Sequence, residues 1–243
     1  MAGDPIKKWT LLNTEATQEL KRVCALSYEH SLMMAVFAAT GLGKTTTFNW
    51  FKDQHPGGVF LVKIEKEWNS RTLYLKILEQ VGVVDYLERW ITIDVLSNKF
   101  ADTILENNRK CLFIFDEAGK FTANMLEYFQ TIRDKTENNM GIILSGTHEF
   151  KGNLDKWRMK QKGAIPELYS RFTQVVEIGA PTKSELLAVA KQNGIKDPQI
   201  LKKLVSESEN FRDVYNKTVT YRAGQAYEAA ELIEEETAEL VPR

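Results

Sequence analysis

Five short apolar runs, rich in β-branched and aromatic residues, alternate along the chain with segments of helical periodicity. The apolar runs are mostly unalternated, which is typical of strands buried on both faces, and they cover residues 32–37, 59–64, 111–115, 141–145 and 174–178. The helical segments between them cover residues 45–54, 70–81, 97–108 and 123–138. This order predicts an α/β fold in which helices flank a five-stranded, mostly parallel sheet.

Helical patterns also flank this α/β region. Before the first strand, Asn13 or Thr14 can cap a helix that continues to about Glu29. After Pro181 the strand-like runs stop, and helical patterns continue as far as Glu236, with the last helix expected from about Val219. The chain is therefore expected to comprise an N-terminal helical segment (1–30), an α/β core (31–180) and an all-helical lid (182–236).

The first apolar run leads into a glycine-rich loop, Ala-Ala-Thr-Gly-Leu-Gly-Lys-Thr, which begins at Ala38 and opens a helix. In such loops the backbone N–H groups surround phosphate oxygens, a lysine reaches the outer phosphates and a hydroxyl ligates Mg²⁺. The usual motif has glycine in place of Ala38, but the rest of the pattern is present. The sequence therefore predicts binding of a nucleoside triphosphate and Mg²⁺. The expected contacts are Ala39, Thr40, Gly41, Leu42, Gly43, Lys44, Thr45 and Thr46, with Thr45 as the metal ligand.

Two carboxylates follow the third apolar run. Because the carboxyl ends of parallel strands meet at one edge of the sheet, Asp116 and Glu117 are expected beside the phosphate loop. Asp116 is predicted to hold Mg²⁺ through water, and Glu117 to orient and deprotonate an attacking water. The fourth run ends near Thr147, which is the predicted polar contact to the terminal phosphate, with Ser145 as the alternative.

These motifs, in this order along about residues 10–236, resemble those of the AAA+ ATPase family. The resemblance implies that ATP is the nucleotide. It also implies that Arg171, in a Ser-Arg-Phe segment, is an arginine finger that acts in trans on the ATP site of a neighbouring subunit. A second sensor arginine is expected in the lid, where Arg212 is the candidate although the usual glycine of Gly-x-x-Arg is Glu209 here.

The compact core, short N-terminal helix and three-helix lid resemble the transposition-regulator ATPases of the phage Mu B-protein and TniB kind. That resemblance implies ATP-dependent assembly as a ring or helical filament on double-stranded DNA, and recruitment of a transposase. A helicase loader and a nucleotide-switched assembly factor are the alternatives. The predicted DNA contacts are Lys63, Lys66, Arg71 and Lys99. Residues 151–162 form a second basic segment, which suits either a subunit interface or DNA. Trp157 within it favours the subunit interface.

Composition narrows the remaining classes. With 43% hydrophobic and 27% charged residues, the 243-residue chain is typical of a globular protein, and no apolar run approaches the length of a membrane span. The net charge of −1 argues against a uniformly basic surface, so DNA contacts must be local. Cys24 and Cys111 lack metal-binding spacing. The first residues lack an apolar signal segment, so a cytoplasmic location is expected, and residues 240–243 look like a cleavable-tag remnant.

Overall fold

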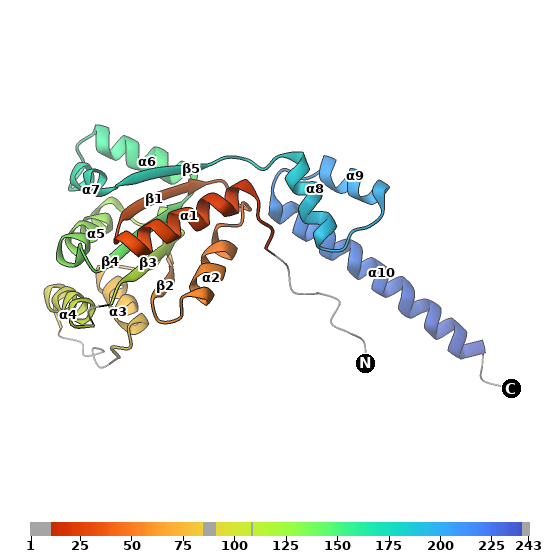
Figure 1. Cartoon of the computed structure of the whole chain (residues 1–243), viewed down its shortest axis with the longest axis horizontal. Helices are drawn as coiled ribbons and strands as arrows, with labels where there is room; N and C mark the ends of the chain where they lie inside the picture. The colour runs from red at the N-terminus through yellow and green to blue at the C-terminus, as the bar shows by residue number, and fades with distance from the viewer. Residues whose placement is uncertain (1–10, 85–90, 108, 240–243) are drawn as a thin grey trace. The chain divides into compact units, whose positions relative to one another are not determined.

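The computed structural model describes residues 11–84, 91–107 and 109–239, so the expected tag remnant lies outside the described residues. Its sheet is parallel throughout, with the strand order β2-β3-β4-β1-β5 (Figure 1). The prediction of a five-stranded parallel sheet flanked by helices is therefore confirmed. The strands are β1 (Met33–Ala38), β2 (Val59–Lys63), β3 (Cys111–Asp116), β4 (Met140–Gly146) and β5 (Gln174–Ile178).

The chain divides into two compact units. The larger unit comprises residues 16–40 and 44–179, and the smaller unit comprises residues 1–15, 41–43 and 180–243. The helices are α1 (Glu15–His30), α2 (Lys44–Gln54), α3 (Ser70–Gln80), α4 (Ile93–Glu106), α5 (Ala123–Thr136), α6 (His148–Met159), α7 (Ile165–Arg171), α8 (Lys183–Gln192), α9 (Pro198–Ser206) and α10 (Phe211–Glu239).

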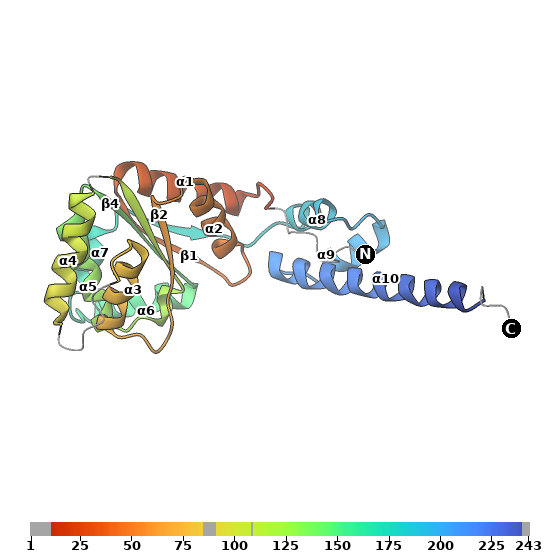
Figure 2. The same ribbon diagram turned by 90° about the horizontal axis from the view of Figure 1, so that it is seen from below.

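The sheet of the larger unit is covered on both faces, as its unalternated strands require. Residues Met33, Ala35 and Phe37 of β1 belong to the apolar core that α3 to α7 complete on one face. Helix α1 lies against the other face, where a side chain at Gly141 of β4 would collide with the carbonyl oxygen of Ser27. Figure 2 shows α1 and α3 on opposite sides of the strands. This arrangement leaves the strand ends free to present polar residues.

Two predicted helix starts were wrong. Helix α4 begins at Ile93 after the cap residue Thr92, not near Ser97, so Lys99 lies in the interior of the helix instead of in its first turn. Helix α10 begins at Phe211, before the predicted start near residue 219, so Arg212 lies in its first turn.

Helices α6 and α7 were not predicted. The buried residues of α6, Phe150 and Leu154, are four residues apart and surrounded by charged residues, so its apolar stripe is weak in the sequence. The N-terminal helix starts at Glu15, directly after Thr14.

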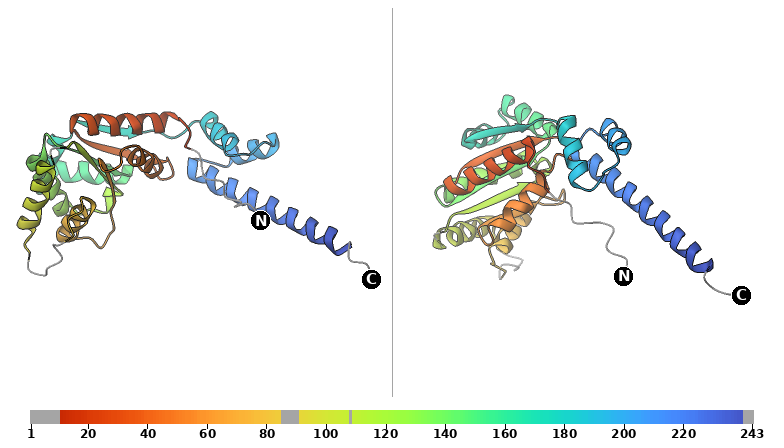
Figure 3. Two further views of the ribbon diagram at one scale, coloured as in Figure 1. Left: turned by 60° about the horizontal axis from the view of Figure 1, so that its bottom comes forward. Right: turned by 45° about the vertical axis from the view of Figure 1, so that its right-hand side comes forward.

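The smaller unit contains helices α8, α9 and α10 around their own apolar cluster, which includes Leu186, Leu201 and Val214. A capping box at the start of α8 joins Thr182 and Glu185 through reciprocal hydrogen bonds. Figure 3 shows α10 as one continuous helix. Among the described residues, no helix combines the length and apolar character needed to cross a membrane.

Candidate nucleotide-binding site

The glycine-rich loop follows β1 directly. Ala38 is the buried last residue of that strand, while the positive φ angles, +80° each, occur at Gly41 and Gly43. The backbone therefore requires glycine at the two positions that the sequence retains, and alanine is tolerated at position 38. The Nζ atom of Lys44 donates to the carbonyl oxygens of Ala38 and Ala39, at 2.8 and 2.9 Å. These contacts hold the lysine within the loop.

The buried carboxylate of Asp116 is the centre of a polar cluster at the end of β3. Its exposed fraction is 2%, and it accepts hydrogen bonds from Thr45 Oγ1 (2.5 Å), Ser145 Oγ (3.1 Å) and the N–H of Glu117 (3.0 Å). Among the described residues, no lysine or arginine forms an ion pair with Asp116. A buried carboxylate with neutral donors alone is costly, and a bound cation would offset that cost.

The residues around Asp116 fit Mg²⁺. The Asp116 carboxylate and the Thr45 hydroxyl are hard oxygen donors already in contact with each other. In the part of the chain that the structure describes, no cluster of three or more His, Cys, Asp or Glu side chains forms a metal cage. This suits Mg²⁺ at nucleotide sites, where few protein oxygens bind the ion and phosphates and water complete its shell.

The strand order explains why Ser145 reaches Asp116. Strand β4 lies between β1 and β3, and Ser145 is paired in register with Val36 of β1. The hydroxyl of Thr147 instead accepts the N–H of Phe150 at 3.4 Å and caps helix α6. Of the two residues considered beside the terminal phosphate, the alternative Ser145 thus contacts the predicted metal-binding carboxylate.

Glu117 is held by two lysines. Its backbone is left-handed, with φ 59° and ψ 35°, and its carboxylate pairs with Lys63 Nζ at 3.5 Å and with Lys120 Nζ. The hydrogen bond from Lys120 is the main reason that the pKa of Glu117 is lowered, and Lys63 lowers it further. The carboxylate is therefore ionised but engaged. To act as a base, Glu117 must exchange lysine contacts for water.

Lys120 was missed by the sequence reasoning. It also donates to the carbonyl oxygen of Ile64 at 3.0 Å, which fixes its direction. A lysine three residues after Glu117, in the turn that follows β3, was the available signal.

Arg171 lies near the amino-terminal ends of the strands, whereas the phosphate loop follows the carboxyl-terminal end of β1. It ends α7 just before β5, whose first residue Gln174 is level with Met34 at the start of β1. Five residues of strand, about 17 Å at about 3.3 Å each, separate that level from the carboxyl edge. An arginine side chain does not span this distance, so Arg171 does not reach its own phosphate loop.

The guanidinium of Arg171 forms a bidentate pair with Asp134 of α5. Nε donates to Oδ1 at 2.7 Å and Nη2 to Oδ2 at 2.9 Å, while Nη1 donates to the carbonyl oxygen of Glu167 at 3.1 Å. The hydrogen bond with Asp134 raises the pKa of Arg171 and lowers that of Asp134. Asp134 is a second residue that sequence reasoning missed, because it is 37 positions from Arg171.

Residues 27–154 of the chain match the AAA domain family model, which is more than half of its length. The chain belongs to the AAA domain family.

The ORC2 protein of Aeropyrum pernix, solved with ADPNP and ADP, has a similar fold, with a TM-score of 0.67 at 17% identity over 96% of this chain and 66% of that one. ORC1 of the same organism in complex with DNA gives 0.62 at 15% over 96% and 63%. The replication initiator DnaA, bound to AMPPCP and single-stranded DNA, gives 0.58 at 13% over 95% and 69%. This AAA protein thus spans slightly less than two thirds of the two Aeropyrum pernix chains. A comparison with curated protein sequences finds no match.

The sensor candidate Arg212 lies in the smaller unit. Its backbone N–H donates to the carbonyl oxygen of Gly41, which belongs to the same unit, at 3.2 Å. A Cβ atom at Gly41 would lie 2.4 Å from Asn210 Oδ1, so glycine is required there for space as well as for its φ angle.

The four predicted DNA contacts of this AAA protein have different environments. Lys63 pairs with Glu117, and Arg71 donates to the carbonyl oxygen of Ile91. Lys66 is exposed between two glutamates in sequence, and Lys99 is half-buried on α4. These positions stay predictions, although two of the four cations already have intramolecular partners.

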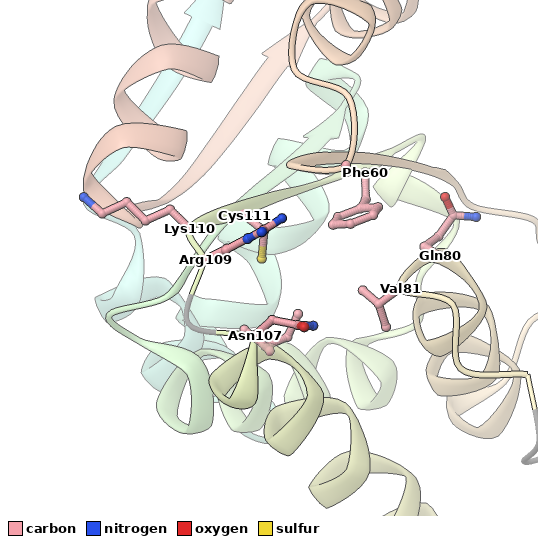
Figure 4. Close-up of a pocket in the computed structure, with 9 residues that line it drawn as sticks. Phe60, Gln80, Val81, Asn107, Arg109, Lys110 and Cys111 are labelled. Carbon is pink, nitrogen blue, oxygen red and sulfur yellow. The ribbon is translucent and has the colours of Figure 1, made fainter.

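A cavity of about 280 Å³ lies near the opposite end of β3, around Phe60, Val81, Asn107, Arg109 and Cys111 (Figure 4). Cys111 begins β3, whereas Asp116 ends it, so this cavity is separate from the polar cluster around Asp116. Burial raises the pKa of the Cys111 thiol to about 12, which makes the thiol unreactive at neutral pH.

Proposed function

We propose that this AAA protein is a magnesium-dependent ATPase that assembles into homo-oligomers, each active site being completed by Arg171 of a neighbouring subunit. The observation that carries the proposal is the cluster of Asp116, Thr45 and Ser145 beside the loop that holds Lys44. This cluster joins a buried metal-binding carboxylate to a phosphate-binding loop. Glu117, next to it, is the residue proposed to activate water.

The position of Arg171 supports action in trans. Arg171 lies near the amino-terminal ends of the strands, so it is too far from the phosphate loop of its own subunit to stabilise charge there. A neighbouring subunit in a ring or filament brings such an arginine to the phosphates through a heterologous interface. Hydrolysis by a lone subunit is therefore expected to be slow.

Within this proposal, the assembly acts on double-stranded DNA and recruits a transposase. ORC1 in complex with DNA and DnaA bound to single-stranded DNA share the fold, which supports DNA as the partner class. The choice of a transposase as the recruited partner is based on the sequence resemblance alone. Negative-stain microscopy tests the DNA step. ATP and long duplex DNA at low salt are expected to produce rings or filaments, and free subunits alone would contradict it.

Mixing two inactive variants tests the shared active site. Arg171→Ala and Glu117→Gln are each expected to bind ATP and to lose most hydrolysis. In a 1:1 mixture, about a quarter of the interfaces combine an intact Glu117 with an intact Arg171 from the next subunit, so activity is expected to return. The measurement is phosphate release per subunit.

The matched control is a mixture of Lys44→Ala and Glu117→Gln. Lys44 and Glu117 belong to the same half of the site, so no interface in that mixture has both, and activity is expected to stay absent. Recovery in the control, or none in the test mixture although both variants assemble, would refute action in trans.

A further inference from the structure

The end of helix α6 and the turn after it carry a concentrated positive charge. We call residues 156–162 the α6 tip. It contains four exposed cations, and no Asp or Glu occurs between residues 156 and 166. The cations are Lys156, Arg158, Lys160 and Lys162.

Among the described residues, none of these four cations forms an ion pair. Lys151, earlier on the same helix, pairs with Asp155 at 3.3 Å and with Glu177 at 3.4 Å. Asp155 also accepts the hydroxyl of Tyr169 at 2.9 Å. Glu127 of α5, beside the end of the tip, accepts the N–H of Ala164 at 3.3 Å. These nearby carboxylates are engaged with other groups, and none of them forms an ion pair with a cation of the tip.

Local contacts give the α6 tip a defined shape. The N–H of Lys162 donates to the carbonyl oxygen of Trp157 at 2.9 Å, which closes the end of the helix. The guanidinium of Arg158 lies over the ring of Tyr169, 4.4 Å from its centroid, and Lys162 lies over Trp157 at 5.5 Å. Stacking on an aromatic ring leaves the edge of a guanidinium available for a phosphate.

The structure favours a polyanion over a protein as the partner. Trp157 packs against the apolar core of its own subunit, so it needs no second subunit to cover it. Protein interfaces have an apolar centre. Within residues 148–171, all of them described, the only exposed large hydrophobic side chain is Met159, at 82%. The net charge of −1 for the whole chain makes this local group of cations distinctive.

We propose that the α6 tip binds the phosphate backbone of nucleic acid, at a site separate from residues 63–71. Lysine and arginine contacts to phosphates fix position without reading sequence, so binding is sequence-nonspecific. The choice of duplex DNA rests on the proposed function. Each phosphate contact releases counterions and makes affinity depend more steeply on salt.

The test is a triple variant, Lys156→Gln with Lys160→Gln and Lys162→Gln. Glutamine removes the charge and keeps most of the aliphatic stem, and Arg158 stays on Tyr169. Fluorescence anisotropy with a labelled random-sequence duplex, with ATP, measures affinity from about 50 to about 200 mM salt. We expect at least a ten-fold loss at low salt. The slope of log K against log salt is expected to become shallower by about 2 to 3, as about three lost phosphate contacts predict.

The matched control is Lys191→Gln with Lys196→Gln and Lys202→Gln in the smaller unit. These lysines are exposed, and the net charge changes equally. The control is expected to bind DNA as the wild type does. Equal losses in both triple variants would show a net-charge effect and overturn the proposal. An α6 tip variant that binds DNA with wild-type affinity and a wild-type salt slope would also overturn the proposal. This holds even if the variant is impaired in subunit assembly, because the tip would then serve assembly and not DNA binding.

Failure of this proposal is distinguishable from failure of the proposed function. If the α6 tip variant binds DNA as the wild type does, the tip site is refuted, but the proposed function is not affected. If wild-type protein with ATP binds no duplex at low salt, both the tip site and the DNA part of the proposed function fail. The mixing experiment on Arg171 and Glu117 then still decides the ATPase.

Discussion

Ser145 and Thr147 end the same strand region, yet their hydroxyls have different partners. Ser145 donates to the buried carboxylate of Asp116, whereas Thr147 accepts a backbone N–H at the start of α6. Replacing each by alanine therefore removes a different interaction. We expect Ser145→Ala to raise the Mg²⁺ concentration that nucleotide binding requires. Thr147→Ala is expected to lower the stability of the fold and to leave that concentration unchanged.

The expected sizes follow from the two hydrogen bonds. A hydrogen bond to a charged group contributes about 1.5–3 kcal/mol, and at 3.1 Å the Ser145 contact has normal geometry. Its loss should lower the free energy of unfolding by about that amount without metal. The 3.4 Å cap contact of Thr147 is long, so Thr147→Ala should cost about 0.5–1 kcal/mol, the low end for an N-cap.

Urea unfolding with and without Mg²⁺ and a non-hydrolysable ATP analogue measures these effects. For Ser145→Ala, the loss of a donor that positions Asp116 should raise the Mg²⁺ concentration needed for nucleotide binding by about ten-fold, or about 1.4 kcal/mol. For Thr147→Ala, the loss should be the same with and without ligand. Thr122→Ala is the matched control, because the Thr122 hydroxyl caps α5 through the N–H of Met125 at 3.3 Å.

One result would refute this reasoning. If Thr147→Ala abolished hydrolysis at wild-type stability, while Ser145→Ala kept the wild-type Mg²⁺ requirement, then Thr147 would be the functional hydroxyl. The Asp116–Ser145 hydrogen bond would then be structural only.

Two further predictions concern charge and packing. Lys120→Met should raise the pKa of Glu117, because it removes the main interaction that lowers it. A carboxyl with a lowered pKa stabilises the fold above about pH 4.5 and loses that effect as pH falls, so the stability difference from wild type should shrink in acid. Gly141→Ala would place a Cβ 2.1 Å from the carbonyl oxygen of Ser27 and should cost about 3 kcal/mol in urea unfolding. Gly152→Ala, in α6 with nothing within 4 Å, should instead stabilise by about 0.5–1 kcal/mol; a loss there would contradict the packing explanation.

The sequence by itself determined the local features of this protein. Apolar runs identified the five strands, because a strand buried on both faces must be apolar throughout. Gly41 and Gly43 marked the positions with positive φ angles, since glycine adopts them without a steric cost. The order of motifs also placed Asp116 and Glu117 at the end of a core strand. Each of these properties depends on residues close together in the chain.

The tertiary structure alone decided which distant residues meet. Ser145 reaches Asp116 because β4 lies between β1 and β3, and strand order is not written in any local pattern. Likewise, Lys63 pairs with Glu117 from a neighbouring strand, and Asp134 pairs with Arg171 from another helix. Helix α6 was not predicted because only two of its residues, Phe150 and Leu154, are buried, so its helical periodicity is weak. Its position is set by contacts with β1 and β4. Long-range packing fixes these contacts, and it assigns the polar residues of the site their partners.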